Sequence, residues 1–186
     1  MELFIITSLT LPILISGIVL IIVIKKKFIQ FLDVPLDYNL TINKVRLFGD
    51  SKTFRGLLVF VVVSIIISYF LRLLYQRGHQ DFIHPIFNAP PILIGLIYSL
   101  SYTFGELINS TIKRRLHIKP GEFTKSKLNN LQHFFDLSDG IIVTAIILTV
   151  FTQVTIVQAI IALVLGIGIH FYTDKLMKSL GLKKNF

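Results

Sequence analysis

Stretches of mainly apolar residues alternate with polar segments along the whole chain. A helix needs roughly 20 apolar residues to cross a bilayer core of about 30 Å. The fourth stretch, residues 140–151, is short, but the upstream apolar residues Leu131, Phe134 and Phe135 can extend it. The pattern therefore predicts an all-α integral membrane protein, a bundle of about five transmembrane helices within a single domain, residues 1–186. The stretches are residues 3–24, 57–74, 91–108, 140–151 and 154–172.

The ends of these stretches and the segments between them refine the prediction. The first stretch follows the acidic Glu2 and precedes no small-residue cleavage site, so we expect it to be retained rather than removed as a signal. The segment 34–56 contains Pro35 and Gly49 and is too polar to span, which predicts a loop packed on the surface of the bundle. The proline-rich segment 81–91 predicts a connection at the opposite end.

Composition supports a lipid environment. Hydrophobic residues make up 53% of the chain and charged residues only 16%, whereas soluble domains average about a quarter charged. The formal net charge of +9 would suggest nucleic acid for a soluble protein. For a membrane protein, anionic headgroups and topology explain it, so we expect no nucleic-acid partner. The chain has no cysteine, which excludes disulfides and thiolate metal sites.

The distribution of basic residues predicts the topology. Segment 25–56 carries seven lysines and arginines, segment 109–139 carries six, and the tail after residue 172 carries four. With five spans, these three segments fall on the same side, and only Arg72 and Arg77 lie on the other. The positive-inside rule then predicts a multi-pass protein of the cell membrane, with an outer N-terminus and a cytoplasmic C-terminus and active site.

Three acidic residues lie at or near the ends of apolar stretches: Glu106, Asp136 and Asp139. The two aspartates are three residues apart and share one face of a helix. A carboxylate at the membrane boundary is costly unless it is solvated, paired or bound to a metal ion. One explanation is that these three residues simply begin helices, because acidic side chains favour the first turn of a helix. Binding of a hard cation such as Mg²⁺ is the other.

A basic cluster follows the glutamate by about two turns. Lys113, Arg114 and Arg115 lie where this helix leaves the bilayer, and Asn109 and Ser110 add neutral donors nearby. One interpretation is that the cluster serves only as a topology signal. It can also clamp phosphate, because the guanidinium fork matches phosphate oxygens and lysine supplies a point charge.

The segment 48–56 reads Phe-Gly-Asp-Ser-Lys-Thr-Phe-Arg-Gly. Two glycines bracket Asp50, Lys52, Thr53 and Arg55, an arrangement that can bring backbone N–H groups and cations against a phosphate. It is not a P-loop, because Ser51 stands where that motif requires a glycine before the lysine. A solvated connection between two spans is the alternative.

These elements together resemble a known family. The segment 48–56 resembles the Gly-Asp/Lys-x-Lys-Thr-Trp-Arg-Gly loop of the CDP-archaeol synthases, and Pro-Leu-Asp at 35–37 is similar to a short element there. Gly-Glu-Leu…Asn-Ser-x-x-Lys-Arg-Arg at 105–115, then Lys-Pro-Gly, then Asp-x-x-Asp at 136–139, follow the order of that family. The wider phosphatidate cytidylyltransferase superfamily shares this order. The motifs cover about residues 33–140.

The resemblance implies an enzyme that transfers a cytidylyl group from CTP to a membrane lipid phosphate and releases pyrophosphate. The lipid would be an archaeal diether glycerol phosphate or phosphatidic acid, and CTP, this lipid and the bilayer would be the partners. The implied Mg²⁺ ligands are Glu106, Asp136 and Asp139. The implied catalytic residues are Lys113, Arg114, Lys52 and Arg55, the last two in a cytoplasmic loop that closes over the site. The implied substrate-binding residues are Asp50, Thr53, Asn109, Ser110, Arg115 and Lys119.

The chain departs from the family pattern in three places. Glu106 replaces the usual aspartate, Phe54 replaces a tryptophan, and the stretch between Gly121 and Asp136 is longer and more polar. The glutamate keeps its charge but reaches about one methylene further. These departures bear on the identity of the substrate more than on the class of reaction.

Other protein classes fit less well. A CDP-alcohol phosphotransferase would continue Asp139-Gly140 as Asp-Gly-x-x-Ala-Arg, but Ile-Ile-Val-Thr follows. A membrane prenyltransferase of the aspartate-rich type would need a second clustered aspartate motif. A small transporter would carry ionisable residues in the middle of its spans. A small transporter and a catalytically inactive relative remain the alternatives, and the oligomeric state stays open, with a homodimer among its alternatives.

Overall fold

The computed structural model describes residues 2–118 and 129–179 of the chain, which fold almost entirely into helices. The α-helices are α1 (Glu2–Ser8), α2 (Leu11–Lys25), α3 (Phe54–Gln76), α4 (Pro91–Arg115), α5 (Asn129–Phe151) and α6 (Ile156–Ser179). Two 3₁₀ helices, η1 (Gln30–Leu32) and η2 (Pro85–Asn88), and a hairpin of β1 (Thr41–Ile42) and β2 (Val45–Arg46) complete the described elements.

The first predicted span is a bent pair of helices rather than one helix. α1 and α2 meet at 42° across a short break. Pro12 lies in the first turn of α2, and its missing N–H interrupts the hydrogen-bond ladder at this point. Four further helices are long and apolar enough to cross a membrane, and counting the bent pair as one span gives five. The predicted all-α membrane bundle is therefore confirmed.

Small residues let the spanning helices pack closely, as is typical of membrane proteins. A Cβ atom on Gly95 of α4 would lie 2.5 Å from the Cα of Ile65, so α3 and α4 touch backbone to backbone there. Ser16 of α2 and Ser64 of α3 are both completely buried, and their hydroxyls lie 3.1 Å apart. Helix packing thus relies on shape and short polar contacts.

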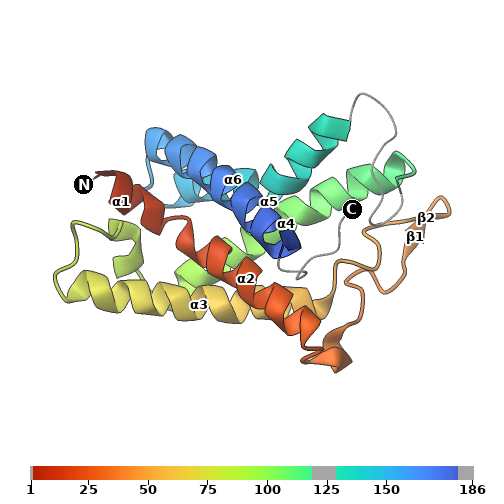
Figure 1. Ribbon diagram of the computed structural model, residues 1–186, viewed down its shortest axis with the longest axis horizontal. Coiled ribbons are helices and arrows are strands. Elements are labelled where there is room, and N and C mark those ends of the chain that lie inside the picture. Colours follow the sequence, from red (N-terminus) through yellow and green to blue (C-terminus); the bar gives the residue numbers. More distant parts are fainter. Residues whose placement is uncertain (1, 119–128, 180–186) are drawn as a thin grey trace.

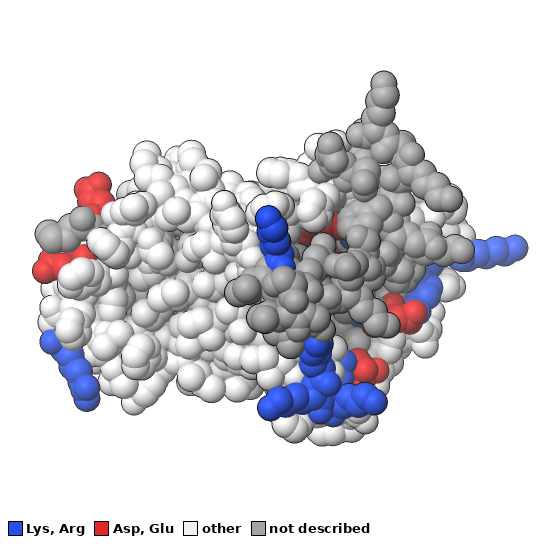
Figure 2. Space-filling model, viewed as in Figure 1, with Lys and Arg blue, Asp and Glu red and all other residues white. Residues whose placement is uncertain are grey.

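Charged side chains gather toward the two ends of the helices. Figure 2 shows that most of the lysines and arginines in view lie at the end where α2 stops and α3 starts. The β1–β2 hairpin and the end of α4 lie at this same end (Figure 1). Arg115 of α4 donates a hydrogen bond to the carbonyl of Ile42 in β1 at 2.9 Å. We call this the loop end of the bundle.

The segment between η1 and α3 was expected to be a plain surface loop, and it is more ordered than that. It contains the hairpin, and Pro35 forms an isolated antiparallel bridge with Thr53. The carboxylate of Asp37 is buried at its centre. The segment is therefore a small folded layer on the loop end.

The connection between α3 and α4 lies at the opposite end and is also packed. His84 is only 2% exposed. Its backbone N–H donates to the hydroxyl of Ser8 at 3.0 Å, and its ring Nδ1 accepts from the N–H of Ile86 at 3.2 Å. Its Nε2 lies 3.2 Å from the Oε1 of Gln158, which fastens this connection to α6. Burial lowers the pKa of His84, so the ring is neutral in the fold.

Candidate active site

One face of α4 carries three polar side chains at the loop end. Glu106, Asn109 and Lys113 are spaced by three and four residues, so they lie above one another along the helix. All three are partly buried, because this face of α4 packs against α5. The sequence therefore places a carboxylate, an amide and an ammonium group in one row.

Asp136 and Asp139 face this row from α5. The helix starts at Asn129, so the two aspartates lie well inside it rather than in its first turn. The explanation that they merely begin a helix is therefore wrong. The apolar residues Leu131, Phe134 and Phe135 do extend the fourth span, as the sequence predicted.

A single amide joins the two aspartates. The Nδ2 atom of Asn109 donates to Oδ1 of Asp136 and to Oδ2 of Asp139, both at 2.7 Å. The ammonium group of Lys113 lies 2.7 Å from the same Oδ1 atom of Asp136. Because both carboxylates bond to the same nitrogen, their oxygens lie close together on the α4 side of α5.

Two glycines allow the backbones of α4 and α5 to approach closely at this point. A Cβ atom on Gly105 would lie 2.4 Å from the carbonyl oxygen of Asp139, and one on Gly140 would lie 2.5 Å from the ring of Tyr102. Neither backbone can retreat without separating α4 from α5. The glycine next to Glu106 and the glycine next to Asp139 therefore hold the polar row against the aspartates.

The layer at the loop end supplies another cation. The ammonium group of Lys52 lies 2.9 Å from Oε2 of Glu106. The N–H of Leu36 donates to the carbonyl of Lys52 at 2.8 Å, which ties this part of the layer to the segment before β1. We define the charge cluster by its six members, which come from three separate parts of the chain. They are Lys52, Glu106, Asn109, Lys113, Asp136 and Asp139.

Asp37 organises the layer that carries Lys52. Burial alone would raise the pKa of this carboxyl group, but the hydrogen bonds that it accepts lower the pKa to about 2. Arg46 donates to Oδ1 at 2.8 Å, and the backbone N–H groups of Phe48 and Gly49 donate to Oδ2 at 3.0 and 3.2 Å. The N–H of Asn39 completes the set at 3.1 Å.

Asp37 and Arg46 are residues whose importance the sequence analysis missed. Asp37 appeared only as part of the Pro-Leu-Asp element, and Arg46 only as one of the counted charges. An aspartate shortly before a turn with Asn39 and Asn43 was the available signal, because Asp side chains commonly accept backbone N–H bonds in turns. That signal does not identify Phe48 and Gly49, eleven and twelve residues after Asp37, as hydrogen-bond donors to its carboxylate.

Several predicted site residues make other contacts. Arg55 lies in the first turn of α3, is only 7% exposed and pairs with Asp33 at 2.9 Å, so its predicted place in a loop over the site is wrong. Arg114 donates to the carbonyls of Phe48 and Ile118.

The remaining predicted residues are also accounted for. Thr53 caps α3 by accepting the N–H of Gly56 at 3.2 Å. Asp50 pairs with Arg46, Ser110 is buried, and Arg115 bonds to β1. Lys119 lies outside the described residues.

The charge cluster has the donor chemistry that a hard cation needs. No three carboxylates or imidazoles converge tightly enough to hold a metal ion in the part of the chain that the structure describes. The carboxylates of Asp136 and Asp139 nevertheless share one hydrogen-bond donor, and Glu106 lies on the facing helix. Mg²⁺ uses one or two carboxylates together with substrate phosphates, so two adjacent carboxylates suffice.

An apolar groove of about 800 Å³ runs along α4 and ends at the start of α3. At the loop end it is lined by Phe48 and Phe54, and toward the opposite end by Leu93. Leu107, the neighbour of Glu106, also lines it, and Arg114 bonds to the carbonyl of Phe48 at 3.3 Å. The groove therefore follows a face of α4 that lies away from the polar row, and no member of the charge cluster lines it.

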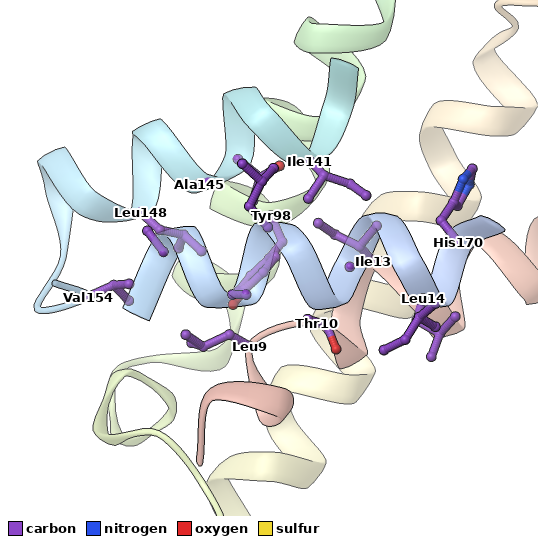
Figure 3. A pocket seen from close by; sticks show the side chains of 16 residues that line it. Leu9, Thr10, Ile13, Leu14, Tyr98, Ile141, Ala145, Leu148, Val154 and His170 are labelled. Atoms are coloured by element: carbon purple, nitrogen blue, oxygen red, sulfur yellow. The ribbon is translucent and has the colours of Figure 1, made fainter. Parts of the chain in front are cut away.

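A second cavity, of about 40 Å³, lies among α2, α4, α5 and α6 and is mainly apolar. Figure 3 shows Ile13, Ile141 and Leu148 around it, with Tyr98 reaching in from α4. Members of the charge cluster do not line this cavity. We therefore assign the candidate site to the charge cluster.

Comparisons with known proteins agree with the motif order. Residues 32–186 match the family model described as CarS-like, CDP-archaeol synthase. A CDP-archaeol synthase of Pyrobaculum aerophilum is 26% identical over 81% of this chain and 80% of its own length. One of Sulfolobus acidocaldarius is 28% identical over 80% of both chains. No solved structure matches the chain. Neither these relatives nor the described residues support the homodimer that the sequence left open.

Proposed function

The chain belongs to the CarS-like CDP-archaeol synthase family, and from that premise we propose how its charge cluster and groove bind and join two substrates. Family membership makes the chain a CTP-dependent lipid cytidylyltransferase of the membrane. The acceptor that we propose is a lipid phosphate, an archaeal diether glycerol phosphate or phosphatidic acid. The products are a CDP-activated lipid and pyrophosphate.

The observation that carries this proposal is the charge cluster itself, in which the ammonium groups of Lys52 and Lys113 pair with carboxylates at the loop end. A lipid phosphate has apolar chains joined to a charged headgroup. The groove lies on another face of α4 than the polar row, but it also reaches the loop end, where Phe48 and Phe54 line it. An alkyl chain in the groove, entering sideways from the bilayer, would leave its phosphate at the loop end, beside the layer that carries Lys52. CTP would arrive from water at the loop end.

The transfer is a substitution at phosphorus. An oxygen of the lipid phosphate attacks the α-phosphorus of CTP in line, and the bond from this phosphorus to the bridging oxygen of the β-phosphate breaks. Pyrophosphate leaves with that oxygen. A phosphate monoester near neutral pH is mostly dianionic, so the attacking oxygen needs no base. The work left to the protein is positioning and neutralising charge.

The cations of the charge cluster suit this work. In the described structure Lys52 pairs with Glu106 and Lys113 pairs with Asp136. A triphosphate would compete for both ammonium groups and draw them away from the carboxylates. Lys52 would then steady the phosphates from the loop layer, and Lys113 from α4.

We propose that Asp136 and Asp139 hold Mg²⁺ together with phosphate oxygens of the substrates, and that the charge of Glu106 on the facing helix supports the ion. The ion, when bound, would neutralise charge on the triphosphate and on the leaving pyrophosphate. Asn109 would keep the two aspartates facing α4, through the two hydrogen bonds that it already donates.

An assay with a panel of lipids tests the acceptor. Purified protein, Mg²⁺ and radiolabelled CTP are incubated with a diether glycerol phosphate, phosphatidic acid or a lipid alcohol without phosphate, and label in the lipid phase is measured. We expect incorporation only with the lipid phosphates, with equimolar pyrophosphate release. Incorporation into the lipid alcohol, or into none of the lipids, would contradict the proposal.

Carboxylate variants test the cation site. Asp136→Asn and Asp139→Asn each remove one ligand charge and should lower the rate roughly a hundredfold or more. Calorimetric titration with Mn²⁺ in the absence of CTP should show weaker binding as well. Glu106→Asp should be tolerated better than Glu106→Gln, because the shorter side chain keeps the charge.

Asp81→Asn is the matched control, because Asp81 is exposed in the connection at the opposite end of the bundle. It should change neither cation binding nor rate. The proposed cation site would be contradicted by unchanged Mn²⁺ binding in Asp136→Asn and Asp139→Asn. It would also be contradicted by a Glu106→Gln variant that is more active than Glu106→Asp.

A further inference from the structure

The last turn of α2 ends in an unusual way. The N–H of Phe28 donates to the carbonyl of Val23 at 3.0 Å, and the N–H of Lys27 donates to the carbonyl of Ile24 at 3.1 Å. This pair of bonds is a Schellman motif, which needs a left-handed residue and usually has glycine there. Lys27 takes that position, with φ of 54°. A side chain is thus kept where glycine would be less strained.

Two other spans, α3 and α4, end in the same motif, and the residue at its left-handed position differs between the two ends of the bundle. α3 stops at the end opposite the loops, and its Schellman position is Gly78, with φ of 95°. α4 stops at the loop end, and its Schellman position is His117, with φ of 59°. Residues that can carry positive charge therefore occupy this strained position at the loop end, where they also face the negative pole of the helix.

Two exposed aromatic rings follow Lys27. Phe28 is 54% exposed and Phe31, in η1, is 79% exposed. Ile29 between them also has a positive φ, of 53°, which is rare for a β-branched residue. The chain therefore accepts backbone strain in a short segment that presents lysines and phenylalanines together directly after a spanning helix.

From these observations we propose that residues 26–31 bind the surface of an anionic bilayer. The phenylalanine rings would sit at the level of the acyl-chain boundary, and the ammonium groups of Lys26 and Lys27 would bind lipid phosphates just above it. Both lysines are exposed in the described structure. Apolar rings beside lysines match a surface that is apolar below and anionic above.

A topology signal alone does not explain this segment. Positive charge on the proper side requires neither a left-handed lysine nor exposed rings, because a signal depends on the number of charges near the span. A soluble partner protein would also cover the rings, but it would have to avoid the adjacent headgroups. The nearness of η1 to the end of α2 favours the bilayer (Figure 1).

Fluorescence tests the depth of the segment independently of enzymatic activity. The chain contains no tryptophan, so Phe31→Trp introduces a single indole. Ile42→Trp is the control, because Ile42 is 50% exposed and lies in the hairpin, which reaches further beyond the helix ends (Figure 1). In phosphatidylcholine vesicles containing phosphatidylglycerol, brominated lipids should quench the indole at 31. Acrylamide in water should quench the one at 42.

Lysine variants in the Phe31→Trp background test the charge. Replacing phosphatidylglycerol by phosphatidylcholine should weaken lipid quenching, as should high salt. The double change Lys26→Gln with Lys27→Gln should abolish the effect of phosphatidylglycerol, whereas Lys26→Arg with Lys27→Arg should preserve it. Equal exposure of both indoles to acrylamide would overturn the proposal and leave a soluble partner as the alternative. An anionic effect that survives the glutamine variants would overturn the assignment of the lysines.

Discussion

Several ionic side chains at the loop end pair with opposite charges or with backbone N–H groups. Asp37 accepts bonds from Arg46 and from three backbone N–H groups, while Lys52 and Lys113 pair with carboxylates of the charge cluster. Paired in this way, the ionic groups keep their charges near the bilayer at a tolerable cost. The same pairing leaves the cations available for exchange onto a phosphate.

Acid should weaken the loop layer through Asp37. Its pKa is lowered from 3.8 to about 2, so the stabilisation is complete above pH 4 and is lost as pH falls through the pKa of about 2. The contribution is about 2 kcal/mol. Thermal unfolding in detergent should show this loss between pH 4 and pH 2. In Asp37→Asn this part of the pH dependence should be missing, and an unchanged curve would contradict the role of Asp37.

Lys52 and Arg55 should respond differently to substitution. Lys52→Ala should lower the rate roughly ten- to a hundredfold with little loss of stability, because it removes a charge facing the cluster. Arg55→Ala should cost about 0.5–3 kcal/mol of unfolding free energy, because it removes a buried side chain together with its pairing to Asp33. Turnover and melting temperature separate the two. Lys52→Arg should retain most of the rate, and an inactive Lys52→Arg variant would contradict a simple charge role.

Helices α4 and α5 form the rigid part of the site. The polar row of α4 and the aspartates of α5 meet because both backbones carry a glycine at the crossing. Helix association in lipid depends on such close contacts, since no hydrophobic effect drives it. The geometry of the charge cluster is therefore a property of the helix pair rather than of any single side chain.

Gly105→Ala tests this dependence. The added methyl group would lie 2.4 Å from the carbonyl oxygen of Asp139, so α4 and α5 must separate. We expect a loss of about 1–3 kcal/mol of unfolding free energy together with lost activity. Gly17→Ala is the matched control, because nothing lies within 4 Å of that position. It should be neutral or stabilising by about 0.5–1 kcal/mol, and equal melting temperatures of the two variants would contradict the proposed contact.

At the scale of the whole molecule, the segments that connect the helices differ in charge between the two ends of the bundle. The segments after α2 and α4 lie at one end of the bundle and the segment after α3 lies at the other, as expected if α1 and α2 form one of five spans. The loop end carries most of the basic residues and the charge cluster. We expect this end to face the cytoplasm, where anionic lipids would attract the basic residues and the nucleotide would be available.

Reporter fusions test the resulting orientation. We expect a fusion before Met1 to report from outside the cell and one after Phe186 to report from the cytoplasm, because the positive-inside rule orients the basic end inward. A further fusion in the connection between α3 and α4 should report from outside. Both termini in one compartment would contradict the five-span topology.

The sequence alone determined the membrane class, the spans and the order of the motifs. Long apolar stretches and unequal numbers of basic residues are properties of the chain that hold however its helices pack. The same local signals predicted that Glu106, Asp136 and Asp139 are unusual. They also left a choice between a helix start and a site, and they placed Arg55 in a loop.

Only the tertiary structure decided which of these residues meet. Asn109 bonds to both aspartates because α4 and α5 cross at Gly105 and Gly140, and Lys52 reaches Glu106 because Asp37 folds the layer that carries it. Such contacts join positions between twenty-seven and fifty-four residues apart, at distances set by helix rotation and crossing. Local propensity fixes neither rotation nor crossing, so the partners of each charge could not be predicted from the sequence.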